Sequence, residues 1–351
     1  MKICKFEDKV LSCLVLNINI VESMQNQILW LNRKEVESLL DMKGALKVVE
    51  EAFRQHGLKR VQMPPKLYLY FTNHNGDLRT MPGYLEDQDI AGVKIVNVHP
   101  DNPKKGLPTV MALVILNSTE SGAPLAIMDG TYLTDMRTGA AGGIAVKYLA
   151  RKNSRTVGFV GTGNQAKSQL LMINEIIDIH EIKATSVSEK QTLAFKDDME
   201  LRIECEITPK KTIKEVCDCD ILVTTTPSRE PIVMNDWISE GTHINAIGAD
   251  APGKEELDPL ILKRAKVVVD DIQQASHSGE VNVPISKGLF SVKDIFGELG
   301  ELITGKKKAR TNDSDITVFD STGLAIQDVA TANLVYQRAL KAKMGIKLQE
   351  F

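Results

Sequence analysis

Apolar and polar positions alternate differently in the two halves of the chain. Before residue 150, short apolar runs end in Asn-Gly, Pro-Gly, Lys-Gly or Ser-Gly pairs, which favour turns between antiparallel strands. Strands are predicted at 28–31, 66–71, 77–82, 90–98, 109–117 and 124–129. Helical spacing of apolar residues predicts a helix capped by Asn32 and two more over 42–56 and 134–149. The first half is therefore expected to contain a meandering sheet accompanied by helices.

From Thr156 onward, predicted strands and helices follow one another in turn. Strands are predicted at 156–160, 182–187, 203–207, 220–224, 243–247 and 266–270. Helices are predicted at 164–177, 190–200, 212–217 and 258–263. This alternation is typical of βαβ units around a parallel sheet. A further strand at 312–319 and a terminal helix over 328–342 complete the pattern.

The first 23 residues do not share the patterns of the rest. Their apolar run is interrupted by Asn17 and Asn19 and lacks a small-residue cleavage site, so a signal peptide or spanning helix is a weak interpretation. Because Met24 offers an alternative start, residues 1–23 are predicted to be an N-terminal extension.

Composition narrows the class of partner. The 351 residues suffice for two domains. With 43 Lys and Arg against 46 Asp and Glu, the net charge of −3 argues against nucleic acid and anionic membranes and favours a small-molecule partner. The only run of like charge, Lys306–Lys308, is expected to be a solvated loop.

The five cysteines form no disulfide-like framework. Their odd number favours a reducing compartment, and the cytoplasm is the expected location. Cys217 and Cys219 have no second Cys/His pair at finger-like spacing, so no metal site is predicted.

A glycine turn lies near the midpoint of the chain. The apolar strand at 156–160 runs into Gly161-Thr162-Gly163-Asn164-Gln165-Ala166, and a predicted helix follows. In a dinucleotide-binding turn, Gly161 permits the tight turn, Gly163 admits a pyrophosphate, and Ala166 allows the helix to pack on the strand. The sequence therefore favours a bound redox cofactor that is a dinucleotide, with an ordinary glycine turn as the alternative.

Several charged residues stand in apolar or small-residue surroundings. Lys94 lies within an apolar strand, so it is either a buried acid/base with a perturbed pKa or a lysine on the strand's solvent face. Arg137 precedes a glycine-alanine segment and is suited to holding an anion. Lys66 and Arg79 flank strands, and Asp250 follows the strand at 243–247, where ligands of parallel sheets bind.

These segments together resemble the family that contains ornithine cyclodeaminase and mu-crystallin, from Ile28 to about Lys347. The motifs that carry the resemblance are Met63-Pro64-Pro65-Lys66, Gly92-Val93-Lys94, Val98-His99-Pro100, Lys105-Gly106-Leu107-Pro108-Thr109, Arg137-Thr138-Gly139-Ala140-Ala141, the turn at 161–166, Gly248-Ala249-Asp250-Ala251-Pro252-Gly253-Lys254 and Asp320-Ser321-Thr322-Gly323. Among its branches, the archaeal alanine dehydrogenases look most similar.

The resemblance implies an α/β fold in which a Rossmann-type nucleotide domain, residues 144–319, is inserted into an α+β domain. That second domain, formed by 24–143 and 320–351, would bind substrate and form a homodimer. The resemblance also implies two acid/base residues, Lys94 and Asp250, and a substrate carboxylate site formed by Lys66, Arg79 and Arg137.

The implied cofactor-binding residues come from both halves of the chain. They are Thr109, Arg137, Gly161, Gly163, Asn164, Gln165, Ser186, Ser188, Thr226, Ile247, Gly248, Ala249, Lys254 and Ser321. The expected cofactor is NAD. Because Ser186 stands where NAD-using relatives have an aspartate for the ribose hydroxyl, NADP stays open.

The resemblance implies reversible oxidative deamination of L-alanine to pyruvate and ammonia. Cyclodeaminases have a glutamate at the position of Arg79, near the distal amine of a diamino acid, so the arginine favours a short substrate. Three alternatives stay open: an ornithine cyclodeaminase that forms proline, a cyclic ketimine reductase, and a crystallin-like protein that binds a small molecule without turnover.

Overall fold

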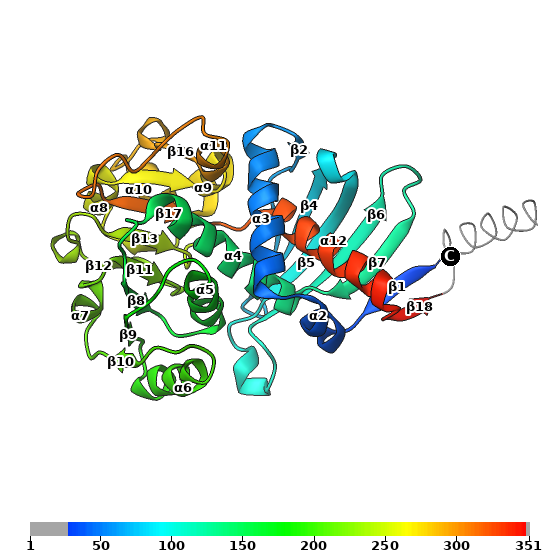
Figure 1. Cartoon of the computed structure of the whole chain (residues 1–351), viewed down its shortest axis with the longest axis horizontal. Coiled ribbons are helices and arrows are strands. Elements are labelled where there is room, and N and C mark those ends of the chain that lie inside the picture. Colours follow the sequence, from blue (N-terminus) through cyan, green and yellow to red (C-terminus); the bar gives the residue numbers. More distant parts are fainter. Residues whose placement is uncertain (1–26, 349–351) are drawn as a thin grey trace, which may run out of the picture.

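The computed structural model describes residues 27–348; the predicted extension at 1–23 lies outside this range. Two large sheets lie side by side (Figure 1). The first sheet has the strand order β18, β1, β7, β6, β5, β4, β2, with β3 also paired to β4. Their bounds are β1 Ile28–Leu31, β2 Val61–Gln62, β3 Leu67–Phe71, β4 Gly76–Leu85, β5 Ile90–Val98, β6 Val110–Ser118, β7 Pro124–Asp129 and β18 Ile346–Leu348.

Helices cover one face of this sheet. They are α2 (Arg33–Leu39), α3 (Met42–Gly57), α4 (Thr131–Leu149) and α12 (Ala325–Ala342), and α3 and α12 lie in front of the strands in Figure 1. Asn32 and Glu35 form a capping box at the start of α2. The predicted cap at Asn32 is therefore confirmed. The apolar sides of these helices and of the strands form one core. The C-terminal helix therefore packs against strands formed by the first 130 residues.

The second sheet is parallel throughout. Its strand order is β10, β9, β8, β11, β13, β17, β15, β16. The bounds are β8 Thr156–Val160, β9 Glu181–Thr185, β10 Ile207–Pro209, β11 Ile221–Thr224, β13 His243–Ala246, β15 Lys266–Val269, β16 Gly297–Glu298 and β17 Thr317–Asp320. The order reverses between β8 and β11, which is the switch point where ligands of such sheets bind. The Rossmann-type α/β fold expected from the sequence is confirmed.

Short helices flank the second sheet. They are α5 Asn164–Asn174, α6 Glu189–Glu200, α7 Ile213–Cys217, α8 Pro259–Arg264, α9 Ile272–Ser278, α10 Asn282–Ser286 and α11 Leu299–Ile303. A separate parallel pair joins β12 (Arg229–Val233) to β14 (Glu255–Leu257). The helix α4 is continuous through residue 143, where a domain boundary was predicted, and it connects the two sheets.

Two predicted strands were misplaced. Residues 203–205 form a bend after α6, and the strand in that region begins only at Ile207. Residues 312–315 also form a turn, because the Asp315 carboxylate accepts bonds from the backbone N–H groups of Thr311 and Asn312. The strand there is therefore only Thr317–Asp320. The Asn-Asp-Ser-Asp segment at 312–315 has the composition of a turn, which the strand prediction overlooked.

Candidate active site

A cavity of about 130 Å³ lies between the first sheet and the carboxyl ends of β13 and β17. The first sheet contributes charged and apolar side chains, α4 contributes one arginine and two threonines, and α5 and the two strand ends contribute mainly polar groups. Its lining residues are Lys66, Arg79, Met81, Lys94, Val96, Val98, Val110, Thr134, Arg137, Thr138, Gln165, Ile247, Asp250, Ser321, Thr322 and Gly323. The structure therefore brings together all five residues predicted for catalysis and substrate binding.

Lys94 is buried in this cavity and paired with an acid that the sequence did not reveal. Its side chain is 1% exposed, and Nζ donates to Oδ1 of Asp328 on α12 at 2.8 Å. Arg137 Nε donates to the same oxygen at 3.0 Å. Burial, together with the Arg137 charge, lowers the pKa of Lys94 to about 7, although Asp328 opposes the shift. The alternative that Lys94 faces solvent is wrong.

Lys66 forms a second cationic position. Nζ donates to the carbonyl of Thr322, and burial lowers the pKa of Lys66 to about 8, against the opposing charge of Asp270. The Asp270 carboxylate accepts bonds from the N–H groups of Thr322 and Gly323, each at 2.7 Å. Burial raises the pKa of Asp270 to about 6. Asp270 thus fixes the turn after β17 that faces Lys66.

Arg79 and Asp250 join the two halves of the site. The Arg79 guanidinium donates to both oxygens of Asp77 and to Asp250 Oδ2, the latter at 2.9 Å. The ring of Tyr68 lies 5.3 Å from the guanidinium carbon. Lys254 Nζ donates to the other oxygen of Asp250 at 2.6 Å. Burial alone would raise the pKa of Asp250, but Lys254 and Arg79 hold it well below its usual range.

Two buried glutamates hold the wall formed by the ends of β11 and β13. Glu256 accepts bonds from the hydroxyl of Thr224, from the N–H and hydroxyl of Thr226, and from the N–H of Gly248, at 2.6 to 2.9 Å. Glu280 accepts bonds from the N–H groups of Glu256 and Leu257. Both glutamates are fully buried. Thr226 and Gly248, predicted to touch the cofactor, are therefore held in place by hydrogen bonds to Glu256. The sequence did not reveal Glu256 or Glu280, the acid that in turn binds the backbone of Glu256.

The glycine turn has the backbone that a dinucleotide requires. Gly161 has a φ of 96°, which favours glycine. Gly163 is the N-cap of α5 and has no side-chain cap, and a Cβ there would meet no atom within 4 Å. Buried oxygens near the turn and the cavity, Thr162 Oγ1, Thr225 Oγ1, Gln165 Oε1 and Ser321 Oγ, have no hydrogen-bond partner within residues 27–348. A free helix N-terminus and unpaired polar atoms fit a nicotinamide dinucleotide.

The other predicted cofactor residues are spread around this turn. Gln165, Ile247 and Ser321 line the cavity. Asn164, at the start of α5, lines a neighbouring cavity of about 420 Å³ instead. Ser186 and Ser188 follow the carboxyl end of β9, where Ser186 Oγ donates to the carbonyl of Ser188. Neither Thr109, which precedes β6, nor Ala249 lines the 130 Å³ cavity.

A histidine and two acids form the only cluster of metal-ligand type within residues 27–348. It consists of His56, Asp271 and Glu298. The two imidazole nitrogens face different carboxylates, and the Lys59 ammonium already lies 3.0 Å from Glu298. These side chains form a polar network, with Lys59 and Glu298 as its ion pair, that ties α3 to α9 and α11.

The geometry of the site agrees with a comparison of the whole sequence with known families. The sequence profile of the ornithine cyclodeaminase/mu-crystallin family matches residues 26–343. The chain belongs to this family. The resemblance inferred from the motifs is thereby confirmed.

Three relatives are similar over almost the whole chain. Alanine dehydrogenase from Archaeoglobus fulgidus is 56% identical over 326 residues, which is 93% of this chain and 99% of the relative. A solved archaeal alanine dehydrogenase dimer with bound NAD is 55% identical, with a TM-score of 0.89 over 93% of this chain and 100% of its own. Thermococcus litoralis Δ(1)-pyrroline-2-carboxylate reductase, solved with NADH and L-proline, is 39% identical, with a TM-score of 0.89 over 92% and 100%.

No helix within residues 27–348 has the length and apolar character needed to cross a membrane.

Proposed function

We propose that this protein is an NAD-dependent alanine dehydrogenase that catalyses the reversible oxidative deamination of L-alanine to pyruvate and ammonia. The observation that carries the proposal is the cavity, which is small and has two chemically different sides. The cations Lys66 and Arg137 suit a carboxylate, whereas Met81, Val96 and Val110 offer an apolar surface for a methyl group. The alanine dehydrogenases that are 55–56% identical support the same substrate.

The residues divide the chemistry between binding and proton transfer. Lys66 and Arg137 bind the carboxylate and direct the Cα–H of alanine toward the turn after β13. A bound NAD would supply the hydride acceptor for this Cα–H. Lys94, with a pKa of about 7, takes one proton from the ammonium group of alanine and releases it to solvent. It then takes a proton from the water that attacks the imine and gives that proton to the amine, which leaves as ammonia. Asp250 stays ionised between Arg79 and Lys254 and stabilises cationic groups during these transfers.

A second candidate is reduction of a cyclic imine. The Thermococcus litoralis reductase solved with L-proline is similar over 92% of this chain, and the same apolar wall suits a five-membered ring. A cyclodeaminase is disfavoured, because Arg79 places a guanidinium where that reaction needs a partner for an amine. A crystallin-like binding protein would need neither Lys94 nor Asp250 in the cavity.

One steady-state screen separates these functions. Purified enzyme is assayed for reduced nicotinamide with L-alanine and NAD, with pyruvate, ammonium and NADH, with Δ1-pyrroline-2-carboxylate and NADH, and with L-ornithine and NAD. Turnover of alanine and pyruvate supports the proposal. A larger kcat/KM for the cyclic imine would replace it, proline without net NADH would identify a cyclodeaminase, and cofactor binding without any turnover would indicate a binding protein.

The proposed cofactor is NAD, with NADP as a weaker alternative. The relatives solved with bound cofactor hold NAD or NADH. Ser186 and Ser188 at the end of β9 carry no negative charge that would exclude a 2′-phosphate. The screen with both cofactors therefore measures a preference rather than an absolute choice.

The proposed assembly is a homodimer formed through the first sheet. On β5, Lys94 and Val96 face the helices and are buried, whereas Val93 and Ile95 point to the other face. That other face carries Leu67 and Leu69 of β3 and Leu113 of β6, which are 55%, 52% and 42% exposed. An apolar sheet face of this kind is suited to a second copy of the chain, and the solved archaeal relative is a dimer.

We also propose the division of the chain into an inserted nucleotide domain, 144–319, and a discontinuous domain formed by 24–143 and 320–351. The separate sheets and the return of α12 to the first sheet support this division.

The proposed location is the cytoplasm. The three cysteines within the described residues are free, which supports a reducing compartment.

A further inference from the structure

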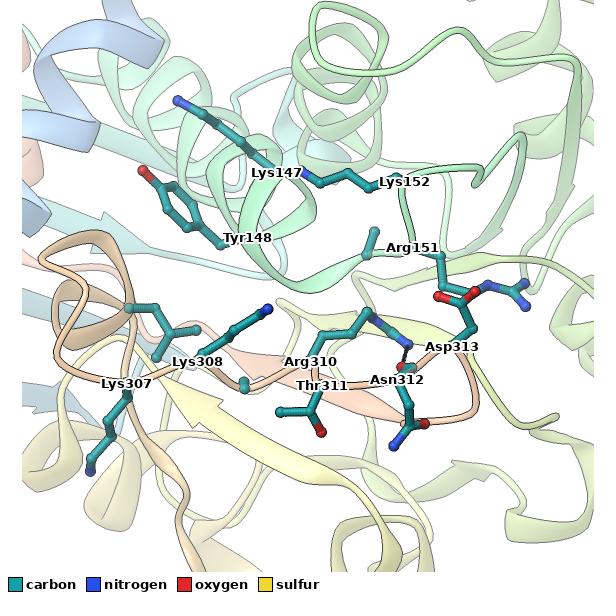
Figure 2. Close-up of a pocket in the computed structure, with 13 residues that line it drawn as sticks. Lys147, Tyr148, Arg151, Lys152, Lys307, Lys308, Arg310, Thr311, Asn312 and Asp313 are labelled. Carbon is teal, nitrogen blue, oxygen red and sulfur yellow. Dashed lines mark hydrogen bonds between the residues drawn. The ribbon is translucent and has the colours of Figure 1, made fainter.

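Another cavity, of about 440 Å³, lies at the opposite end of the second sheet from the active site. It is formed by the end of α4 with the residues that lead into β8, and by the segment that leads into β17 (Figure 2). These segments precede their strands, so the cavity lies at the amino ends of β8 and β17. Most of its charged side chains are basic: Lys147, Arg151, Lys152, Lys307, Lys308 and Arg310, against the single acid Asp313.

Half of these cations are already balanced. Lys147 pairs with Glu50 at 2.8 Å, Lys307 pairs with Glu301 at 3.1 Å, and Arg151 pairs with Asp220. Figure 2 shows the Lys307 ammonium pointing away from the end of α4. These three side chains therefore contribute little uncompensated charge to the cavity.

The other three cations have no ion-pair partner among residues 27–348. Arg310 donates only to uncharged oxygens, among them the carbonyls of Leu149 and Asp315, each at 2.6 Å. Lys152 and Lys308 are exposed and have no hydrogen-bond partner there. Against Asp313 alone, Lys152, Lys308 and Arg310 leave a surplus of about two positive charges in a concave surface, where a field of one sign is concentrated.

The charges in the cavity are also crowded. Burial lowers the pKa of Arg310, and the charge of Arg151 lowers it further, whereas Asp315 and Asp313 oppose the shift. Nε of Arg151 is buried and has no hydrogen-bond partner in the described part of the chain. A buried donor without a partner costs free energy, and so does the approach of two guanidinium groups. An anion in the cavity would offset the repulsion between the two guanidinium groups.

We propose that this cavity binds a small dianion, a phosphate group. A phosphate monoester carries about −1.5 to −2 charge at pH 7 and three strong acceptor oxygens, which match the surplus charge of the cavity and the free ammonium groups of Lys152 and Lys308. In Figure 2, Lys308 and Arg310 project from the lower segment toward the end of α4. The bound group would bridge these two segments. Of the lysine run 306–308, Lys306 and Lys307 donate to the carbonyls of Gly57 and Phe296, which leaves Lys308 for the ligand.

Titration calorimetry on the full chain saturated with NAD tests the proposal, because the cofactor then blocks phosphate binding at the glycine turn. Inorganic phosphate, pyrophosphate and AMP are titrated at constant ionic strength, with chloride as the reference. We expect saturable binding of one phosphate per chain and an affinity about tenfold lower in Lys152→Gln and in Lys308→Gln, as lost charge-assisted contacts imply. Lys263→Gln, an exposed lysine of α8 with no ion-pair partner among the described residues, is the matched control.

The outcomes are distinct. Equal affinity for phosphate and AMP identifies the phosphate group as the ligand, and tighter AMP binding identifies a nucleotide as its source. Heat no larger than that of chloride would overturn the proposal, and so would binding that both lysine variants leave unchanged. Because the readout is binding at a site remote from Lys94, it does not depend on which substrate the enzyme turns over.

Discussion

The Lys94 ammonium lies 2.8 Å from the Asp328 carboxylate, although 234 residues separate them in the sequence. Lys94 comes from the middle of β5, and Asp328 comes from the first turn of α12. Both side chains are buried, and Oδ2 of Asp328 has no hydrogen-bond partner within residues 27–348. The terminal helix therefore completes a site whose other parts are formed long before it in the chain.

Replacing Lys94 by alanine removes the proposed acid/base. We expect Lys94→Ala to lower kcat for L-alanine about 10²–10⁴-fold, the usual contribution of a positioned proton-transfer group. The measurement is steady-state formation of NADH, with cofactor binding followed by fluorescence quenching. Lys341→Ala, on the exposed side of α12, controls for loss of a lysine. Near-normal turnover with bound cofactor would remove Lys94 from the mechanism.

The pKa of Lys94 predicts opposite pH profiles for the two directions. Burial lowers this pKa to about 7. Alanine oxidation needs the neutral amine, so its kcat/KM rises as pH increases through about 7, and pyruvate amination needs the ammonium and falls over the same range. Asp328 raises the pKa of Lys94, so Asp328→Asn moves both midpoints to lower pH. A variant with less activity but an unchanged midpoint would assign Asp328 to packing alone.

Some site residues could be predicted because their immediate neighbours in the sequence are unusual for a residue of that type. Lys94 is a cation in an apolar strand, and Asp250 follows a parallel strand, so local pattern suffices for both. It does not suffice for Asp328, Asp270, Glu256 and Glu280, because an acid becomes significant only through the donor that the fold brings to it. Glu280, for example, accepts from the N–H of Glu256, which lies 24 residues away.

The same distinction applies to the fold. The change from turn-separated strands to alternating strands and helices marks the start of the parallel sheet at Thr156, and local periodicity was enough to predict it. Strand order depends on contacts between distant segments. The pairing of β18 with β1, for example, joins Ile28 to Leu348 and leaves no signal in either short segment. The short strands β12 and β14 likewise depend on each other for pairing.

Glu256 is expected to support cofactor binding through its hydrogen bonds to Thr226 and Gly248. Glu256→Gln replaces one acceptor oxygen by an amide that cannot accept from the N–H groups of Thr226 or Gly248. The loss of buried hydrogen bonds should lower the free energy of unfolding by about 1–3 kcal/mol. It should also raise the KM for NAD. Thermal denaturation and cofactor titration measure both effects. Glu51→Gln, which removes a surface carboxylate paired with Arg54, is the control. Unchanged cofactor affinity would limit Glu256 to stability.

Ser186 is expected to set the tolerance for NADP. It stands directly after β9, and its hydroxyl carries no charge. Ser186→Asp places a carboxylate beside the ribose, where it accepts a bond from the 2′-hydroxyl and repels a 2′-phosphate. We expect the ratio of kcat/KM for NAD to that for NADP to rise at least about tenfold. A ratio that does not change would show that the ribose lies elsewhere.

Leu113 tests the proposed dimer. It is 42% exposed on the sheet face that no helix of the described residues covers, and it lies between Ile95 of β5 and Asp129 of β7. A carboxylate buried between two such faces has no partner, so Leu113→Asp should convert the dimer to a monomer at micromolar concentration, as measured by light scattering during size-exclusion chromatography. Leu201→Asp, at an 88% exposed leucine after α6, should leave the dimer intact. Because Leu113 is partly exposed in the single chain, the monomer should keep its secondary structure by circular dichroism. A dimer that survives the Leu113 substitution would place the interface on another surface.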